Sequence, residues 1–176
     1  MTFSRFFSAA FVAALCATSM ASAQTATPVP DVKPDFSGMQ WMLGTWTCKT
    51  LKNSMGRGAG RIETDVNSMT LDGHYMMTSG TSKPFDKART TTLTTQGWIG
   101  YDKAKKAWFS FGISNFGGFG MSTSPGWVGN KIVWTDMYAS DGGALGVSTV
   151  TKVSAVKMTS INVTKGQTTS DSCTKS

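Results

Sequence analysis

The side chains with chemical potential lie close together in one extended stretch. Arg61, Glu63 and Asp65 alternate along the chain, so on a β-strand all three would project from the same face. Turned inward beside His74, the single histidine, the two carboxylates would form a polar site able to transfer protons. Buried carboxylates are costly unless they are paired, and Arg61 is their one certain partner. We therefore favour a solvent-facing trio and predict no catalytic residue, with an enzyme using Glu63, Asp65 or His74 as the alternative.

Aromatic and methionine side chains give the main indication of a function. Phe109 and Phe111 alternate on one face of a predicted strand, Trp98 lies on its neighbour, and Met121 and Trp134 follow later. A barrel interior walled by such side chains can hold an apolar or amphipathic molecule, and we predict these five residues as the ligand-binding set. In a barrel of about eight strands the same rings can also fill the interior. A structural or interaction protein with a filled core is therefore a further alternative.

Two cysteines, Cys48 and Cys173, lie near opposite ends of the predicted folded region. An even number of cysteines in an exported chain indicates a disulfide. A metal site has less support, because two thiols and one histidine at no recognisable spacing are too few ligands. We expect no cofactor. The remaining cysteine, Cys16, falls in the leader and would be removed with it.

The first 23 residues have the pattern of a secretory signal peptide. An early arginine precedes an apolar run of about a dozen residues, which is short for a membrane span. Ala21-Ser22-Ala23 then fits a signal-peptidase site, and cleavage after Ala23 predicts a periplasmic or secreted protein. Residues 24–35 contain three of the five prolines and are expected to form a disordered linker.

The chain is basic, with a formal net charge of +7. A basic balance can indicate a nucleic acid or an anionic membrane as partner. Here the positive residues are scattered singly, and the densest group, in the stretch DKAKK at 102–106, has the composition of a solvated turn. We therefore expect no nucleic-acid partner and no membrane span.

Beyond residue 45, Thr, Ser, Gly, Val and aromatic residues dominate, and turn signals recur at short intervals. This pattern predicts an all-β domain over residues 36–176, with its clearest hairpin turn at Asp72-Gly73. Eight to ten antiparallel strands joined by short turns form a meander, and a meander of this length must close or split into two sheets. Closure would pair the first and last strands and bring Cys48 opposite Cys173. We predict an up-and-down β-barrel.

The stretch FSGMQWMLGTWTC is expected to form one helical turn that plugs the barrel, followed by a tight turn at Gly44 into the first strand. Trp46 would cover the barrel floor, and Cys48 would share its face. A plug followed by Gly-x-Trp resembles the entrance of the calycin superfamily, which includes lipocalins and nitrobindins. The stretches MTLDGHYMMTSG and GWIGYDKAKKAWFSFG resemble a bacterial family of unknown function in that neighbourhood.

The resemblance covers roughly residues 36–174 and implies a barrel that holds a ligand. It does not imply haem, since nitrobindin-like proteins hold haem iron through a histidine late in the chain, and this chain has none after His74. Taken with the composition, it predicts an exported, non-enzymatic protein that binds a small apolar or amphipathic molecule.

Overall fold

The computed structural model describes residues 32–53, 60–83, 92–140 and 142–176. The predicted leader, residues 1–23, and most of the predicted linker lie outside this part of the chain. A short 3-10 helix, η1 (Ser37–Met42), precedes a chain made almost entirely of strands. The strands are β1 (Gly44–Asn53), β2 (Ile62–Thr70), β3 (Tyr75–Ser82), β4 (Leu93–Asp102), β5 (Ala107–Ser114), β6 (Phe119–Ser124), β7 (Trp127–Val128), β8 (Lys131–Ala139), β9 (Gly146–Ser154), β10 (Lys157–Thr164) and β11 (Gln167–Lys175).

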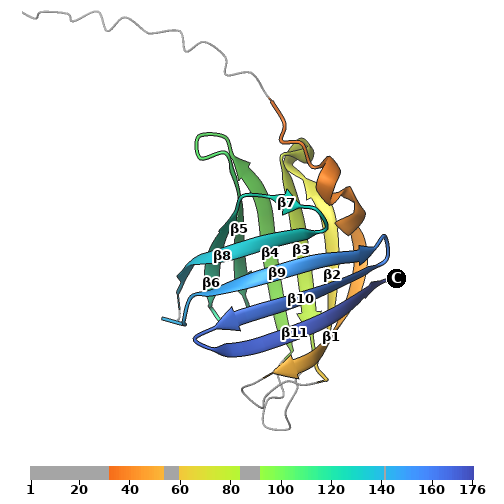
Figure 1. The fold of residues 1–176 in the computed structure, drawn as a ribbon, viewed down its shortest axis with the longest axis vertical. Helices are drawn as coiled ribbons and strands as arrows, with labels where there is room; N and C mark the ends of the chain where they lie inside the picture. The colour runs from red at the N-terminus through yellow and green to blue at the C-terminus, as the bar shows by residue number, and fades with distance from the viewer. Residues whose placement is uncertain (1–31, 54–59, 84–91, 141) are drawn as a thin grey trace, which may run out of the picture. The chain divides into compact units, whose positions relative to one another are not determined.

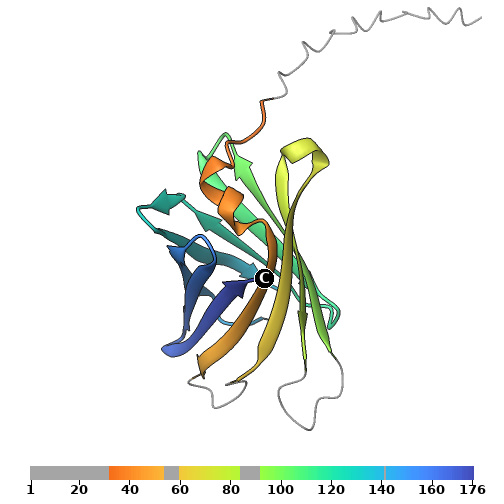
Figure 2. The same ribbon diagram turned by 90° about the vertical axis from the view of Figure 1, so that its right-hand side faces the viewer.

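The strands close into an antiparallel barrel, as predicted. Each strand pairs with its neighbour in the chain from β1 to β6 and from β8 to β11, β1 pairs with β11, and β6 pairs with β8. Ten strands therefore complete the ring, and the two-residue β7 pairs with the start of β8. Figures 1 and 2 show η1 lying across one end of this barrel. Among the described residues, no helix has the length and apolar character needed to cross a bilayer.

The seam between the first and last strands carries the predicted cross-link. Cys48 lies directly opposite Cys173 in the β1–β11 ladder, and the two sulfurs form a disulfide that spans 125 residues of sequence. Trp46 and Cys48 project from the same face, as the alternation along β1 requires. Gly44 enters β1 at φ +102°, a conformation that favours glycine, and thereby lets the chain turn from η1 into the strand.

The hairpin predicted at Asp72-Gly73 joins β2 to β3. Both residues have positive φ, and they belong to a one-turn 3-10 element, η2 (Leu71–Gly73). The predicted register is confirmed, with Met69 opposite Met76. This register determines which side chains of β2 and β3 share a face.

The apolar core lies at the end of the barrel that η1 covers. Trp46 and Met76 are fully buried, and the indole N–H of Trp46 donates to the carbonyl oxygen of Met42 at 2.7 Å. The side chains that pack together there come from η1 and from strands on all sides of the ring: Phe36, Met39, Met42, Met69, Met76, Ile99, Trp108, Trp127, Ile132, Trp134 and Val150. The plug end is therefore closed by side-chain packing, and any open space must lie toward the other end.

Candidate functional site

The interior away from η1 is lined by small and polar side chains. Because Met76 is buried inside the barrel, the residues that share its face on β3 also point inward, and the ladders carry this facing to the neighbouring strands. One inward row crosses β2 to β5 through Asp65, Gly80, Thr95 and Ser114. The next row toward η1 crosses β2 to β8 through Asn67, Thr78, Gly97, Gly112, Gly120 and Ala139.

The glycine row leaves a hollow in the inner wall. A cavity of about 420 Å³, open to solvent on one side, lies against it, and its lining includes Thr78 and Thr95. A Cβ added to Gly112 would meet no atom closer than 3.6 Å, and added to Gly97 or Gly120 it would meet only backbone atoms, at 3.4 Å or more. None of the three glycines has a positive φ, so the backbone does not require glycine there. Their effect is to keep this part of the interior empty.

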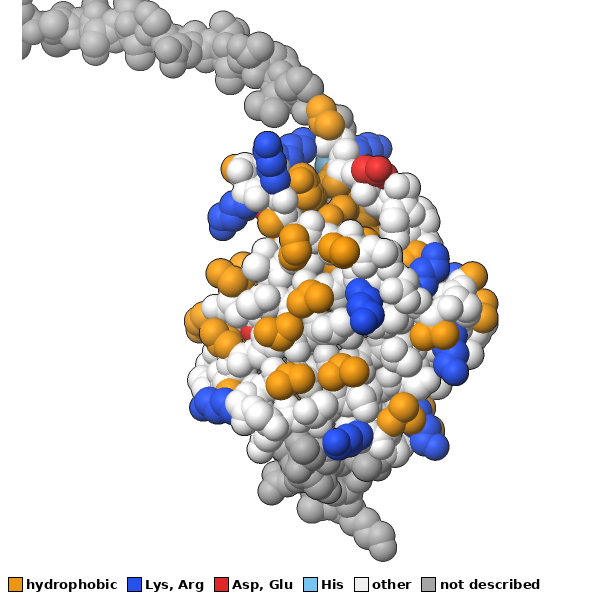
Figure 3. Space-filling view, viewed as in Figure 1, with side chains coloured by type: hydrophobic (Ala, Val, Ile, Leu, Met, Phe, Trp, Pro, Cys, Tyr) orange, Lys and Arg blue, Asp and Glu red, His pale blue; other side chains and the backbone are white. Residues whose placement is uncertain are grey.

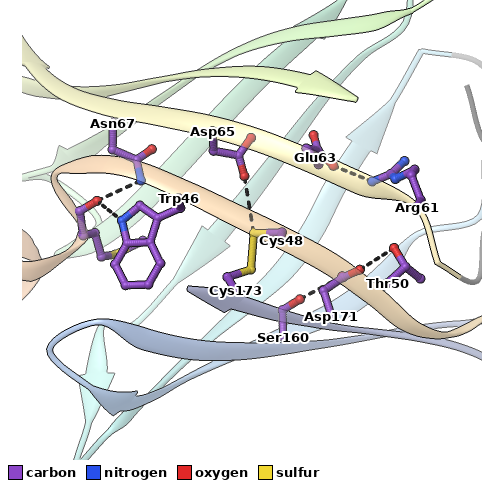
Figure 4. The surroundings of a disulfide bond; sticks show 11 residues. Trp46, Cys48, Thr50, Arg61, Glu63, Asp65, Asn67, Ser160, Asp171 and Cys173 are labelled. Carbon is purple, nitrogen blue, oxygen red and sulfur yellow. Dashed lines mark hydrogen bonds and ion pairs between the residues drawn. A yellow bond between two sulfur atoms is a disulfide. The ribbon is translucent and has the colours of Figure 1, made fainter. Parts of the chain in front are cut away.

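An acidic cluster adjoins the cavity at Thr95. Asp65 and Glu63 project inward from β2, and Arg61 forms an ion pair with Glu63 (Figure 4). The pKa of Asp65 is raised to about 7, mainly by burial and next by the neighbouring Glu63, with a smaller contribution from Asp171, while Arg61 acts to lower it. Asp65 therefore changes its protonation state near neutral pH, where a surface aspartate would be fully ionised.

The disulfide forms part of this cluster. Oδ2 of Asp65 lies 3.7 Å from Sγ of Cys48. A disulfide sulfur carries no hydrogen, so this contact becomes a hydrogen bond only when the carboxyl group is protonated and donates to the sulfur. On the other side of the seam, Asp171 accepts hydrogen bonds from Thr50 and Ser160 at 2.7 and 3.0 Å (Figure 4). The carboxylate of Asp171 thus accepts hydrogen bonds from two hydroxyl groups. The carboxyl group of Asp65 accepts none from a hydroxyl group among the described residues.

Charge is distributed unevenly between the two sides of the barrel wall. Glu63, Asp65, Asp136 and Asp171 point inward, and Arg61 forms an ion pair with Glu63. The outer face over β8 to β11 carries apolar side chains and lysines with little acidic surface (Figure 3). The interior is therefore acidic within a chain whose net charge is +7.

The structure places only one of the five predicted ligand-binding residues inside the barrel. Trp134 is buried in the apolar core near η1. Trp98, Phe111 and Met121 lie in register across β4, β5 and β6 on the outer face, where the rings of Trp98 and Phe111 stack at 6.0 Å. Phe109, on the same side of β5, covers Gly100 from outside. The expected interior lining by these four residues is therefore wrong.

Trp98, Phe111 and Met121 form a row across the outer face, which we call the outer apolar row, and it extends onto β3 and β8. Met77 precedes Trp98 in the cross-strand register, and Tyr138 follows Met121. Met121 and Tyr138 are 43% and 48% exposed. This row is the surface on which the predicted interaction role would act.

The residues of the predicted enzyme site are only partly brought together. Glu63 and Asp65 face the interior, which corrects the expectation that they face water. Asp65 lies directly opposite the fully buried Trp46 in the β1–β2 ladder, so its side chain points to the same, inner face, and Glu63 shares that face. His74 follows η2 at the plug end, while Glu63 lies opposite Ser82 at the other end of β3. Eight residues of strand separate His74 from Ser82, or roughly 25 Å.

The sequence analysis missed the glycine row and gave the acidic interior only as the less favoured alternative, although both leave a signal. Once Trp46 is taken as the inward floor of the barrel, the β1–β2 pairing and the Asp72-Gly73 hairpin fix the inward face of β2 and β3. Asp65, Thr78 and Gly80 then have to be inside. No group of three or more metal-ligating side chains is present within the described ranges.

Comparison of the chain with models of known protein families gives no match, and neither does comparison with curated proteins.

Proposed function

We propose that the protein binds one small amphipathic molecule inside its barrel, without chemical conversion. The observation that carries the proposal is the cavity of about 420 Å³ beside the glycine row Gly97, Gly112 and Gly120. Its volume falls within the range of ordinary ligand pockets, roughly 300–1,000 Å³. Side chains could fill this space with no backbone change, so the glycines favour a role for the space itself.

The lining favours an amphipathic ligand over a purely apolar one. Glycine backbone and apolar edges line one part of the cavity, and the hydroxyl groups of Thr78, Thr95 and Ser114 line another. The Thr78 hydroxyl donates to Oδ1 of Asn67 at 2.6 Å and the Ser114 hydroxyl to the carbonyl oxygen of Gly118 at 3.4 Å. Each hydroxyl oxygen can still accept a hydrogen bond from a polar ligand group, which a hydrocarbon cannot supply. The closed apolar packing under η1 also leaves the ligand next to the polar half of the barrel.

The barrel architecture, the plug and the Gly44-x-Trp46 entrance support membership of a calycin-like family, which we propose on those features together. The disulfide between Cys48 and Cys173 supports a periplasmic or secreted location, because disulfides persist in oxidising compartments. An export route through the sequence at 1–23 is part of the same proposal.

The test combines ligand retention with cavity filling. Native mass spectrometry of the oxidised protein, purified from its source, should detect a small molecule that dissociates unchanged. Gly112→Val places a branched side chain in the cavity and should weaken binding of the neutral fluorophore N-phenyl-1-naphthylamine at least about tenfold, or 1.4 kcal/mol. Thr135→Val, at an exposed position of β8, should not weaken it. An apo mass, together with equal fluorophore binding by both variants, would overturn the proposal.

A further inference from the structure

Three side-chain oxygens converge over Gly80 on the inner wall. A Cβ at Gly80 would lie within 3.1 Å of Oδ1 of Asp65, Oε1 of Glu63 and Oγ1 of Thr95. Glycine is therefore needed at this position for the three oxygens to occupy the space, even though its φ does not demand it. We call these three oxygens and the backbone of Gly80 the Gly80 oxygen site.

The Gly80 oxygen site has more negative than positive charge around it. Asp65 and Glu63 belong to it, Asp171 is near enough to act on Asp65, and Arg61 pairs with Glu63. Within the described ranges, three carboxyl groups thus share one guanidinium group in a partly buried space. A second cation would relieve the repulsion between the carboxylates and compensate for the water they have lost.

The buried hydroxyl group of Ser82 lies beside the Gly80 oxygen site. Ser82 lies opposite Glu63 and shares the inward face of β3 with Gly80. Its side chain is 1% exposed, and its Oγ has no hydrogen-bond partner among the described residues. Buried hydroxyl groups are seldom left without a partner, so a ligand atom that satisfies Ser82 fits the same place.

We propose that the Gly80 oxygen site binds the ammonium group of an amphipathic primary amine, whose apolar part occupies the cavity beside the glycine row. This inference rests on the proposed ligand-binding function and specifies its ligand class. A primary ammonium group has three N–H donors, and the site offers three acceptor oxygens from Asp65, Glu63 and Thr95. Hydrogen bonds between charged partners are roughly twice as strong as neutral ones. Thr95 belongs to both the site and the cavity lining, which makes the two halves of the ligand position continuous.

The test compares two probes that differ in one polar group. Isothermal titration calorimetry with n-octylamine and 1-octanol at pH 8 should show that the oxidised protein binds the amine at least about tenfold more tightly. Asp65→Asn should remove this preference and leave the affinity for the alcohol unchanged. Asp136→Asn serves as the matched control, because its carboxylate is inward but accepts from Ser122 and the backbone of Gly146 instead.

Proton release provides a readout that a merely structural role of Asp65 would not give. Binding of the ammonium group at pH 6.5 should ionise Asp65, and titration in buffers of different ionisation enthalpy should detect more than about half a proton released per amine bound. The release should vanish in Asp65→Asn and with 1-octanol. Glu63→Gln, which keeps the side-chain shape, should also lower the amine preference and supplies the test if Asp65→Asn does not fold.

The two proposals fail in distinguishable ways. Equal binding of amine and alcohol, both weakened by Gly112→Val, would overturn the amine inference and keep the ligand-binding function. Binding of neither probe, with Gly112→Val indistinguishable from the original protein towards N-phenyl-1-naphthylamine, would overturn both. An amine preference that persists in both Asp65→Asn and Glu63→Gln would place the ammonium group elsewhere and also overturn the inference.

Discussion

Replacing Asp65 by asparagine should make the protein more stable above neutral pH and remove much of its pH dependence. The folded protein holds the pKa of Asp65 at about 7, against an ordinary value of 3.8 for a free aspartate side chain. Between these two values the folded state binds more protons than the unfolded state, so stability falls as the pH rises. Below pH 4 both states are protonated and the penalty disappears. Asparagine cannot ionise and therefore carries no such penalty.

The magnitude follows from the size of the shift. A difference of about 3 pK units corresponds to about 4 kcal/mol once the pH exceeds 7. Asp65 is only partly buried, which reduces the penalty, and we expect on the order of 2 kcal/mol. For a domain of this size that difference corresponds to a gain of roughly 4–8 °C in Tm at pH 8, with little gain at pH 4.

The assay is urea unfolding of the oxidised protein and the variant at pH 4, 5.5, 7 and 8, read as the difference between them at each pH. Subtracting the two curves cancels the titration of all other groups. Asp72→Asn is the matched control, because Asp72 is exposed in the η2 turn at φ 54°, which asparagine tolerates. A constant difference between pH 4 and pH 8, or a variant that loses stability at pH 8, would refute the argument that burial raises the pKa of Asp65.

Three further outcomes are expected. Reduction of the disulfide, or the double change Cys48→Ala/Cys173→Ala, should lower the free energy of unfolding by up to about 4–5 kcal/mol, because the bond closes a loop of 125 residues and so restricts the unfolded chain. An unchanged midpoint of urea unfolding would contradict this. Trp46→Ala should lower the free energy of unfolding, measured with urea, by about 3–5 kcal/mol, because the side chain is fully buried and its indole N–H donates to the carbonyl oxygen of Met42. A loss under about 1 kcal/mol would show that neighbouring side chains fill the space that Trp46 leaves. Phe111→Ala, on the outer face, should leave binding of N-phenyl-1-naphthylamine unchanged, and a tenfold weaker affinity would instead place the ligand on the outer apolar row.

Much of the architecture is predictable because its determinants are local. The predicted strand that carries Phe109 and Phe111 is β5, and the Asp72-Gly73 turn has the positive φ values that a tight hairpin needs. Short turns force neighbouring strands to pair, and a long meander avoids a free edge by closing. The disulfide then follows, because closure leaves Cys48 and Cys173 on adjacent strands.

The candidate site is less predictable, because alternation along a strand shows which side chains share a face but does not show which face lies inside the barrel. Phe109 and Phe111 share one face of β5, and Ser110 and Gly112 share the other, but nothing within that strand states which face is inside. Hydrophobicity favours an inward aromatic face, and that expectation is wrong here. The outer face carries Phe109 and Phe111, and the inner face carries Ser110 and Gly112, with Trp108 of that face packed in the core under η1.

The sequence alone determined the strand order, the position of the turns, the plug and the cross-link, since each depends on residues close in the chain or on a single pairing. The tertiary structure decided which face of each strand is turned inward. Burial of Trp46, Met76 and Ile132 under η1 fixes the inward face of the strands that carry them. The registers of the hydrogen-bonded ladders then fix the inward face of every other strand in the ring. Asp65 and Gly112 are inside because their registers connect them to those buried side chains.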